Sequence, residues 1–91
     1  MGWTVIFREN AQKAFYKLDG VAQRKIQRFI TQKIESAKDP RVFAEPLRYE
    51  WQSLWRFRIG KYRLICRIED KRLVVLVIRI GHRSDVYESR Q

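Results

Sequence analysis

The residues best suited to chemistry in this chain are arginines, with one histidine and one tyrosine near the end of the sequence. The stretch GHRSDVY contains His82, Arg83 and Tyr87, and it follows the apolar run LVVLVIRI, residues 73–80. Histidine and tyrosine can transfer protons, and arginine binds phosphate groups through paired hydrogen bonds. The stretch therefore indicates either a reaction centre at the rim of a rigid sheet or, more simply, a turn and a solvated tail.

The charge of the chain favours a polyanionic partner. Twenty Lys and Arg residues against ten Asp and Glu give a net charge of +10 and a pI near 10.4 over 91 residues. Residues 1–53 carry ten basic and six acidic side chains, whereas residues 54–91 carry ten and four, and eight of those last ten bases are arginine. RNA, DNA or an acidic protein is the expected partner, although a basic surface that binds nothing would have the same composition.

Composition and motifs exclude several other classes of protein. With 45% hydrophobic and 33% charged residues, the chain is typical of one small folded domain spanning residues 1–91. The single cysteine, Cys66, has no internal disulfide partner, which fits a reducing cytoplasm. No apolar run approaches the roughly 20 residues of a membrane helix, so we expect a soluble cytoplasmic protein. The sequence has no metal-ligand spacing, nucleophilic triad or glycine-rich phosphate loop, and no metal or cofactor is expected.

The first half of the chain predicts a strand and two helices. WTVIFR, residues 3–8, alternates like a short strand. A helix with Asn10 as its N-cap is then predicted to run until Asp19-Gly20 closes it. A second helix, residues 21–37, has one apolar face and is stopped at Pro40. Residues 40–53 hold both prolines without a clear period, and they are interpreted as an irregular crossing segment.

The second half predicts three strands in a meander. Residues 54–59 and 62–69 alternate, with Gly60-Lys61 as a two-residue turn, and residues 73–80 are apolar on both faces, as in a central strand. The order β-α-α-β-β-β predicts an α+β fold, with a helical hairpin packed on a small antiparallel meander sheet.

Strand parity gathers arginines on one face of this sheet. Arg56 and Arg58 share a face of strand 54–59, and pairing across the two-residue turn puts Arg58 opposite Arg63. Like charges in direct opposition destabilise a sheet. The arrangement favours a phosphate-binding surface, with Arg83 delivered by the next strand, over arginines that are merely solvated.

The element order and three segments resemble the RelE/ParE toxin superfamily, in particular its RelE-like branch. The segments are LWRFRIGKYRLICRIED (54–70), RLVVLVIRIGHR (72–83) and SDVY (84–87), and PLR at 46–48 also matches. The resemblance covers nearly the whole chain, with YRL and GHRSDVY as its most specific parts. It implies the toxin of a type II toxin–antitoxin pair, an endoribonuclease that inhibits translation by cleaving messenger RNA in the ribosomal A site. The 2′-hydroxyl would attack the adjacent phosphate without metal or cofactor.

By position, the resemblance implies a catalytic group on the outer face and at the end of the chain. Arg63 and Arg83 would clamp the scissile phosphate, and Tyr87 would stack on a base or donate a proton. Some RelE-like toxins have lysines where this chain has Arg56 and Arg58, and an arginine is a poor general base. His82 and Tyr87 are therefore the candidates for that role. The predicted catalytic residues are Arg58, Arg63, His82, Arg83 and Tyr87, and the predicted RNA-binding residues are Arg56, Lys61 and Arg67.

Two other functions remain open at this point. A ParE-like protein poisons DNA gyrase without cutting RNA, and an inert member acts only through its antitoxin complex or binds RNA passively. The set Arg63, Arg83 and Tyr87 favours the endoribonuclease, because gyrase poisons as a group tend to lack it. The antitoxin partner also follows from the resemblance, and a +10 surface favours an acidic segment that is disordered when free.

Overall fold

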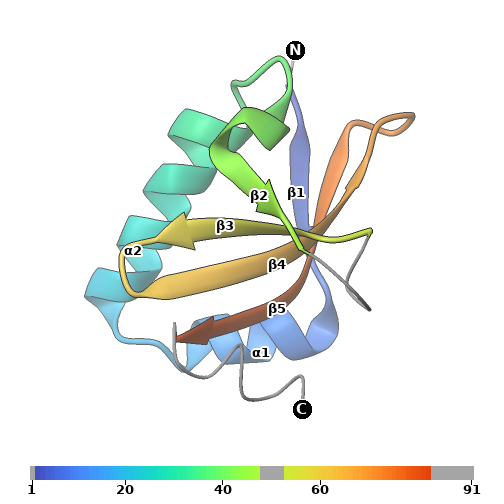
Figure 1. The fold of residues 1–91 in the computed structure, drawn as a ribbon. Coiled ribbons are helices and arrows are strands. Elements are labelled where there is room, and N and C mark those ends of the chain that lie inside the picture. Colours follow the sequence, from blue (N-terminus) through green and yellow to red (C-terminus); the bar gives the residue numbers. More distant parts are fainter. Residues whose placement is uncertain (1, 48–52, 83–91) are drawn as a thin grey trace.

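Two helices cover one face of a five-stranded sheet in the computed structural model of the chain, which describes residues 2–47 and 53–82 (Figure 1). The elements in chain order are β1 (Thr4–Phe7), α1 (Glu9–Tyr16), α2 (Gly20–Phe29), β2 (Ala44–Pro46), β3 (Trp55–Ile59), β4 (Tyr62–Glu69) and β5 (Val74–His82). The predicted α+β class, the helical hairpin and the β3–β4–β5 meander are confirmed.

The sheet is mixed, which the predicted antiparallel meander did not include. Its strand order is β1-β5-β4-β3-β2, and β1 runs parallel to β5, with Thr4 paired to Val74 and Phe7 to Val77. The other neighbouring strands are antiparallel. β5 is therefore paired on both sides over its first residues, which confirms the predicted central strand.

The prediction of an irregular segment over residues 40–53 was wrong for its first part. Pro40–Phe43 form a 3₁₀ turn, and Ala44–Pro46 form β2, which pairs antiparallel with β3 and puts Glu45 opposite Arg56. A strand of three residues shows no readable alternation. Pro46 is tolerated in it because an edge strand does not need every N–H for pairing.

Both predicted helix boundaries need correction. Arg8, not Asn10, is the N-cap of α1, and Asn10 lies in the first turn. Asp19 does not close α1 but caps α2, since its Oδ1 accepts a 2.8 Å hydrogen bond from the N–H of Ala22. The predicted 21–37 helix is α-helical only to Phe29 and widens into a π-helical segment, Ile30–Ile34.

The core lies between the helices and one face of the sheet. Phe57, Leu64, Cys66, Val75 and Val77 are fully buried there, packed against the apolar faces of α1, α2 and the π-helical segment. The predicted apolar faces of β3 and β4 are thus confirmed. The opposite face, which the helices leave uncovered, is turned toward the viewer in Figure 1.

Candidate functional site

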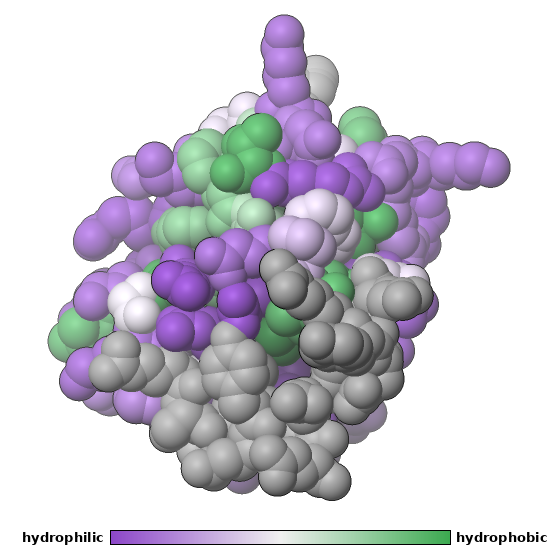
Figure 2. Space-filling model, in the orientation of Figure 1, coloured by the Kyte–Doolittle hydropathy of each residue, from purple (hydrophilic) through white to green (hydrophobic). Residues whose placement is uncertain are grey.

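The uncovered face of the sheet carries arginines from three neighbouring strands. Arg58 pairs directly with Arg63 across the β3–β4 turn, as predicted, and Arg56 pairs with Ile65 two positions further along. Arg63 is buried, with 8% of its surface exposed, and the Arg56 side chain is 13% exposed. Figure 2 shows hydrophilic side chains gathered over these strand ends. Packing against the sheet therefore holds the two guanidinium groups in place, which favours binding of a fixed anion.

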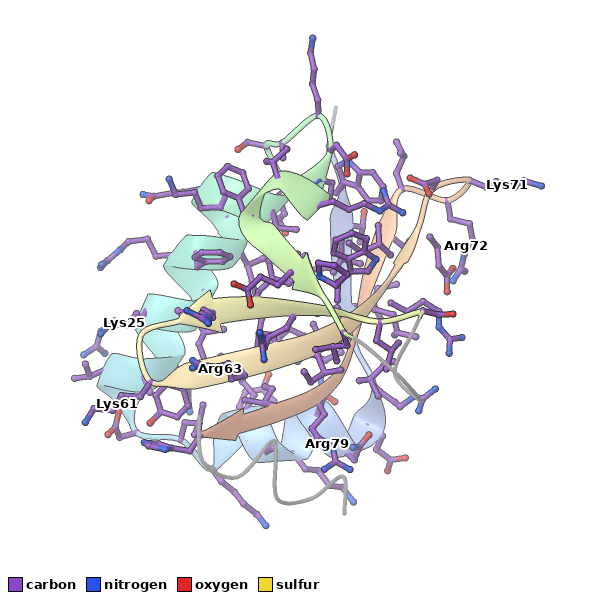
Figure 3. The ribbon with its side chains drawn as sticks, in the orientation of Figure 1. Lys25, Lys61, Arg63, Lys71, Arg72 and Arg79 are labelled. Carbon is purple, nitrogen blue, oxygen red and sulfur yellow. The ribbon has the colours of Figure 1, made fainter. Side chains whose placement is uncertain are left out.

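Arg79 adds a fourth arginine to this surface, one that sequence reasoning missed. It pairs with Ile65, which also pairs with Arg56, so Arg56, Ile65 and Arg79 form one cross-strand row. Gly81, two residues further on, pairs with Arg63, so Arg63 and Arg79 are diagonal neighbours on adjacent strands (Figure 3). We call the surface formed by Arg56, Arg58, Arg63 and Arg79 the arginine face.

Glu45 is a carboxylate on the arginine face, and it too was missed because its strand was missed. It forms an ion pair with Arg56 and lies 3.7 Å from a terminal nitrogen of Arg58. The hydrogen bond from Arg56, together with the positive charges of Arg58 and Arg63, holds the pKa of Glu45 below its usual range. Glu45 is therefore ionised near neutral pH and offsets part of the positive charge of the arginine face.

His82 lies on the other side of the sheet from the arginine face. It pairs with Tyr62, and the two rings meet edge to face with centroids 5.8 Å apart. Tyr62 packs against the helix-side core, while its neighbour Arg63 belongs to the opposite face. His82 therefore lies on the helix side of the sheet, away from Arg58 and Arg63. The predicted catalytic site had grouped it with those two arginines.

The remaining predicted site residues are spread more widely. Lys61 is exposed in the β3–β4 turn, whereas Arg67 is exposed further along β4, opposite Leu76. Arg83 and Tyr87 lie outside the described residues. The described part of the site is therefore concentrated where β3, β4 and the end of β5 lie side by side.

A second basic surface runs along α2. Residues 20–34 contain no acidic side chain, and their cations are Arg24, Lys25, Arg28 and Lys33. Arg24, Lys25 and Arg28 are exposed and make no ion pair with a described residue. The Nζ of Lys25 lies 3.5 Å from the position that a Cβ on Gly60 would occupy, so α2 approaches the β3–β4 turn that carries Lys61 (Figure 3). We call Arg24, Lys25 and Arg28 the α2 surface.

The described residues offer little for metal or thiol chemistry. Cys66 faces the core, and burial raises the pKa of its thiol, which keeps the sulfur protonated. No group of three His, Cys, Asp or Glu side chains in residues 2–47 and 53–82 is placed to hold a metal ion. None of the helices described there is long and apolar enough to cross a membrane.

Fold and site together define a small basic α+β protein with an arginine-rich sheet face, and known proteins share its sequence pattern and fold. The family model described as the ParE toxin of the type II toxin–antitoxin system parDE matches residues 5–87. Toxin RelG of Mycobacterium tuberculosis is 31% identical over 87 residues, which is 96% of this chain and 98% of RelG. The mRNA interferase toxin RelE of Escherichia coli is 31% identical over 94 aligned positions, or 96% and 92% of the two chains.

Solved structures of toxins from the same family have a similar fold. The toxin–antitoxin complex RelBE2 from M. tuberculosis contains a chain with a TM-score of 0.81 and 29% identity, covering 93% of this chain and 95% of that one. A chain of the intact E. coli RelBE toxin–antitoxin complex has a TM-score of 0.72 at 27% identity, with 88% and 95% covered. The chain belongs to the RelE/ParE superfamily and is the toxin of a type II toxin–antitoxin system.

Proposed function

We propose that this toxin is an endoribonuclease that cleaves messenger RNA in the ribosomal A site and thereby inhibits translation. The observation that carries the proposal is the arginine face, where two of four arginines are held largely buried beside a carboxylate. Cations held in fixed positions stabilise the charge that develops on a phosphate as it is attacked. The name of the E. coli relative, an mRNA interferase, supports the same activity.

In the proposed reaction, the RNA itself supplies the nucleophile. The ribose 2′-oxygen forms a bond to the adjacent phosphorus, and the bond from phosphorus to the 5′-oxygen breaks. The products are a 2′,3′-cyclic phosphate and a 5′-hydroxyl. Arg63 and Arg58, with Arg83, would bind the non-bridging oxygens and stabilise the pentacoordinate state. One proton leaves the 2′-hydroxyl and one is delivered to the 5′-oxygen, so the enzyme needs an acceptor and a donor.

Glu45 is the candidate acceptor that the arginine face provides. It is the carboxylate that contacts Arg56 and Arg58 among the described residues, and its lowered pKa keeps it ionised at neutral pH. The same shift makes it a weaker base, so the bound phosphate must displace Arg56 from it for the carboxylate to gain basicity. Tyr87 remains the proposed proton donor or stacking residue. His82 is a weaker candidate for the acceptor, since it lies on the helix side.

The α2 surface supports ribosome docking. Arg24 and Arg28 are one helical turn apart, and like charges at this spacing destabilise a helix. Phosphates of a folded RNA would offset that repulsion. The scissile strand and ribosomal RNA could then be bound at the same time, by the arginine face and the α2 surface respectively.

A cognate antitoxin would neutralise this toxin. Two of the solved relatives are complexes of toxin with antitoxin. The net charge of +10 favours an acidic segment that wraps the basic surfaces. Such a segment would be partly disordered when free and would order on binding.

A ParE-like gyrase poison is the second candidate, because the matching family model describes a ParE toxin. One experiment separates the two. Purified toxin is added to a translation reaction, and the 5′-ends of the message are mapped. Codon-phased cuts that disappear in Arg63→Ala and persist in the control Arg72→Ala are expected. Intact message together with stabilised gyrase–DNA cleavage complexes would instead establish the gyrase poison.

A further inference from the structure

β5 contains one residue more than its partner strand, and this extra residue decides where Arg79 points. Ile65 pairs with Arg79, but the next residue of β4, Cys66, pairs with Val77, so Ile78 has no partner of its own. Such a bulge exchanges the two faces of the strand beyond it. Val77 faces the core, Arg79 lies on the arginine face, and Ile80 packs toward the core. With regular alternation from Val77, Arg79 would have faced the core instead.

The first turn of α1 holds this bulge. The Nδ2 of Asn10 donates a 3.2 Å hydrogen bond to the carbonyl of Ile78, and the backbone N–H of Arg8 donates a 2.9 Å bond to the carbonyl of Val77. In a regular strand, successive carbonyls point to opposite neighbours. Here the carbonyls of Val77 and Ile78 both accept hydrogen bonds from the junction between β1 and α1. The bulge turns the Ile78 carbonyl away from β4, and Asn10 supplies the hydrogen bond that this carbonyl would otherwise lack.

We propose that Asn10 is a positioning residue that fixes the Ile78 bulge and thereby keeps Arg79 on the arginine face, where Arg79 binds an RNA phosphate. The RNA-binding part of this inference rests on the proposed function. The structural part does not, because it concerns only the register of β5. Asn10 lies outside the arginine face and acts on RNA only through the strand that it holds.

The substitution Asn10→Asp separates this role from a general effect on stability. Aspartate has nearly the same shape, but its carboxylate cannot donate a hydrogen bond to the Ile78 carbonyl. A negative charge in the first turn of a helix is favourable, so α1 itself should be unharmed or slightly stabilised. Asn10 is exposed, so the substitution disturbs no core packing.

The structural readout is amide hydrogen exchange, measured by NMR on the free toxin. In Asn10→Asp, the amides of Arg79 and Ile80 should exchange about tenfold faster or more, since they lose protection by local opening of the bulge. The amides of Ile68 and Val75, which pair with each other at the far end of the β4–β5 ladder, should not change. Unchanged exchange at Arg79 and Ile80 in a folded variant would overturn the inference.

The functional readout is binding of a fluorescent 2′-O-methyl RNA oligonucleotide, which cannot be cleaved. Asn10→Asp should weaken binding severalfold and reduce the slope of log K against log salt by about 0.7, the value for one phosphate contact on a single strand. In an Arg79→Ala background, Asn10→Asp should have no further effect. In the control background Arg67→Ala, its effect should persist in full.

Additive effects of Asn10→Asp and Arg79→Ala would overturn the role of Asn10 in aiming Arg79. If Arg63→Ala also leaves oligonucleotide binding unchanged, the proposed function itself fails, and with it the RNA-binding part of the inference. In that case hydrogen exchange still decides whether Asn10 fixes the bulge. The two failures are therefore distinguishable in one set of variants.

Discussion

Arg58 and Arg63 are direct cross-strand partners on the arginine face, so two cations oppose each other in the β3–β4 ladder. Replacing Arg58 by threonine, a good strand former, should relieve about 0.5 kcal/mol of repulsion and raise the Tm by about 2–4 °C. RNA cleavage should fall about tenfold to a hundredfold, as expected when one charged hydrogen bond to a phosphate is lost. Calorimetry and message-end mapping measure the two effects. Arg67→Thr, opposite Leu76, is the matched control, and it should show no gain in Tm.

Glu45→Gln should separate RNA binding from cleavage. Removing the carboxylate frees Arg56 and Arg58 for phosphate, so an uncleavable oligonucleotide should bind a few-fold more tightly. Cleavage should slow by about 10²–10⁴, the usual contribution of a general base. Stopped-flow cleavage and fluorescence anisotropy test this, and equal losses in both would contradict the role of Glu45 as proton acceptor.

The same residue gives a prediction about pH. Because Arg56 lowers the pKa of Glu45, the folded state favours the charged carboxylate. That contribution to stability is present above the unfolded pKa, near 4.3 for glutamate, and is lost as the pH falls through the lower folded value. Denaturant titrations from pH 7 downwards should therefore show the wild type losing stability in acid more steeply than Glu45→Gln. Parallel curves would show that the ion pair does not form in solution.

His82→Gln should have little effect on the pH–rate profile. His82 stacks edge to face with Tyr62 on the helix side of the sheet, away from Arg63. Cleavage should remain within a few-fold of the wild type and keep its acidic limb. A severe loss of rate together with loss of that limb would instead establish His82 as the general base, and it would require β5 to rearrange on the ribosome.

The α2 surface is expected to matter on ribosomes and not on short RNA. The double variant Arg24→Glu and Arg28→Glu should abolish cleavage of translated message, since it replaces two cations by anions where ribosomal RNA would bind. Binding of a short oligonucleotide should change little at physiological salt, because screening limits the reach of these charges to about 8 Å. Lys71→Glu with Arg72→Glu, in the β4–β5 turn at the other end of the sheet, makes the same change in net charge and should retain activity (Figure 3). If both double variants lost cleavage activity equally, the loss would come from the change in net charge and not from the α2 surface.

Sequence reasoning succeeded where information was local. Strict alternation on both sides of Gly60-Lys61 was sufficient to pair Arg58 with Arg63, because a two-residue turn sets the register. It failed for Glu45, since a three-residue edge strand that includes Pro46 shows no period. It also missed Arg79, because the run LVVLVIRI is apolar at successive positions and carries no alternation that could reveal a bulge at Ile78. The parallel pairing of β1 with β5 joins segments too distant for any local pattern to indicate.

The parallel pairing of β1 with β5 means that the fold is completed only after β5 has been synthesised. Thr4 pairs with Val74, which lies 70 positions later in the chain, and β1 has no neighbouring strand until then. Contacts of such long range slow folding, because the chain must close a long loop before they form. A chain interrupted before β5 lacks Arg79 and leaves Val5 and Phe7 without the strand that packs beside them. A chain that ends before β5 therefore lacks both part of the arginine face and part of the hydrophobic core.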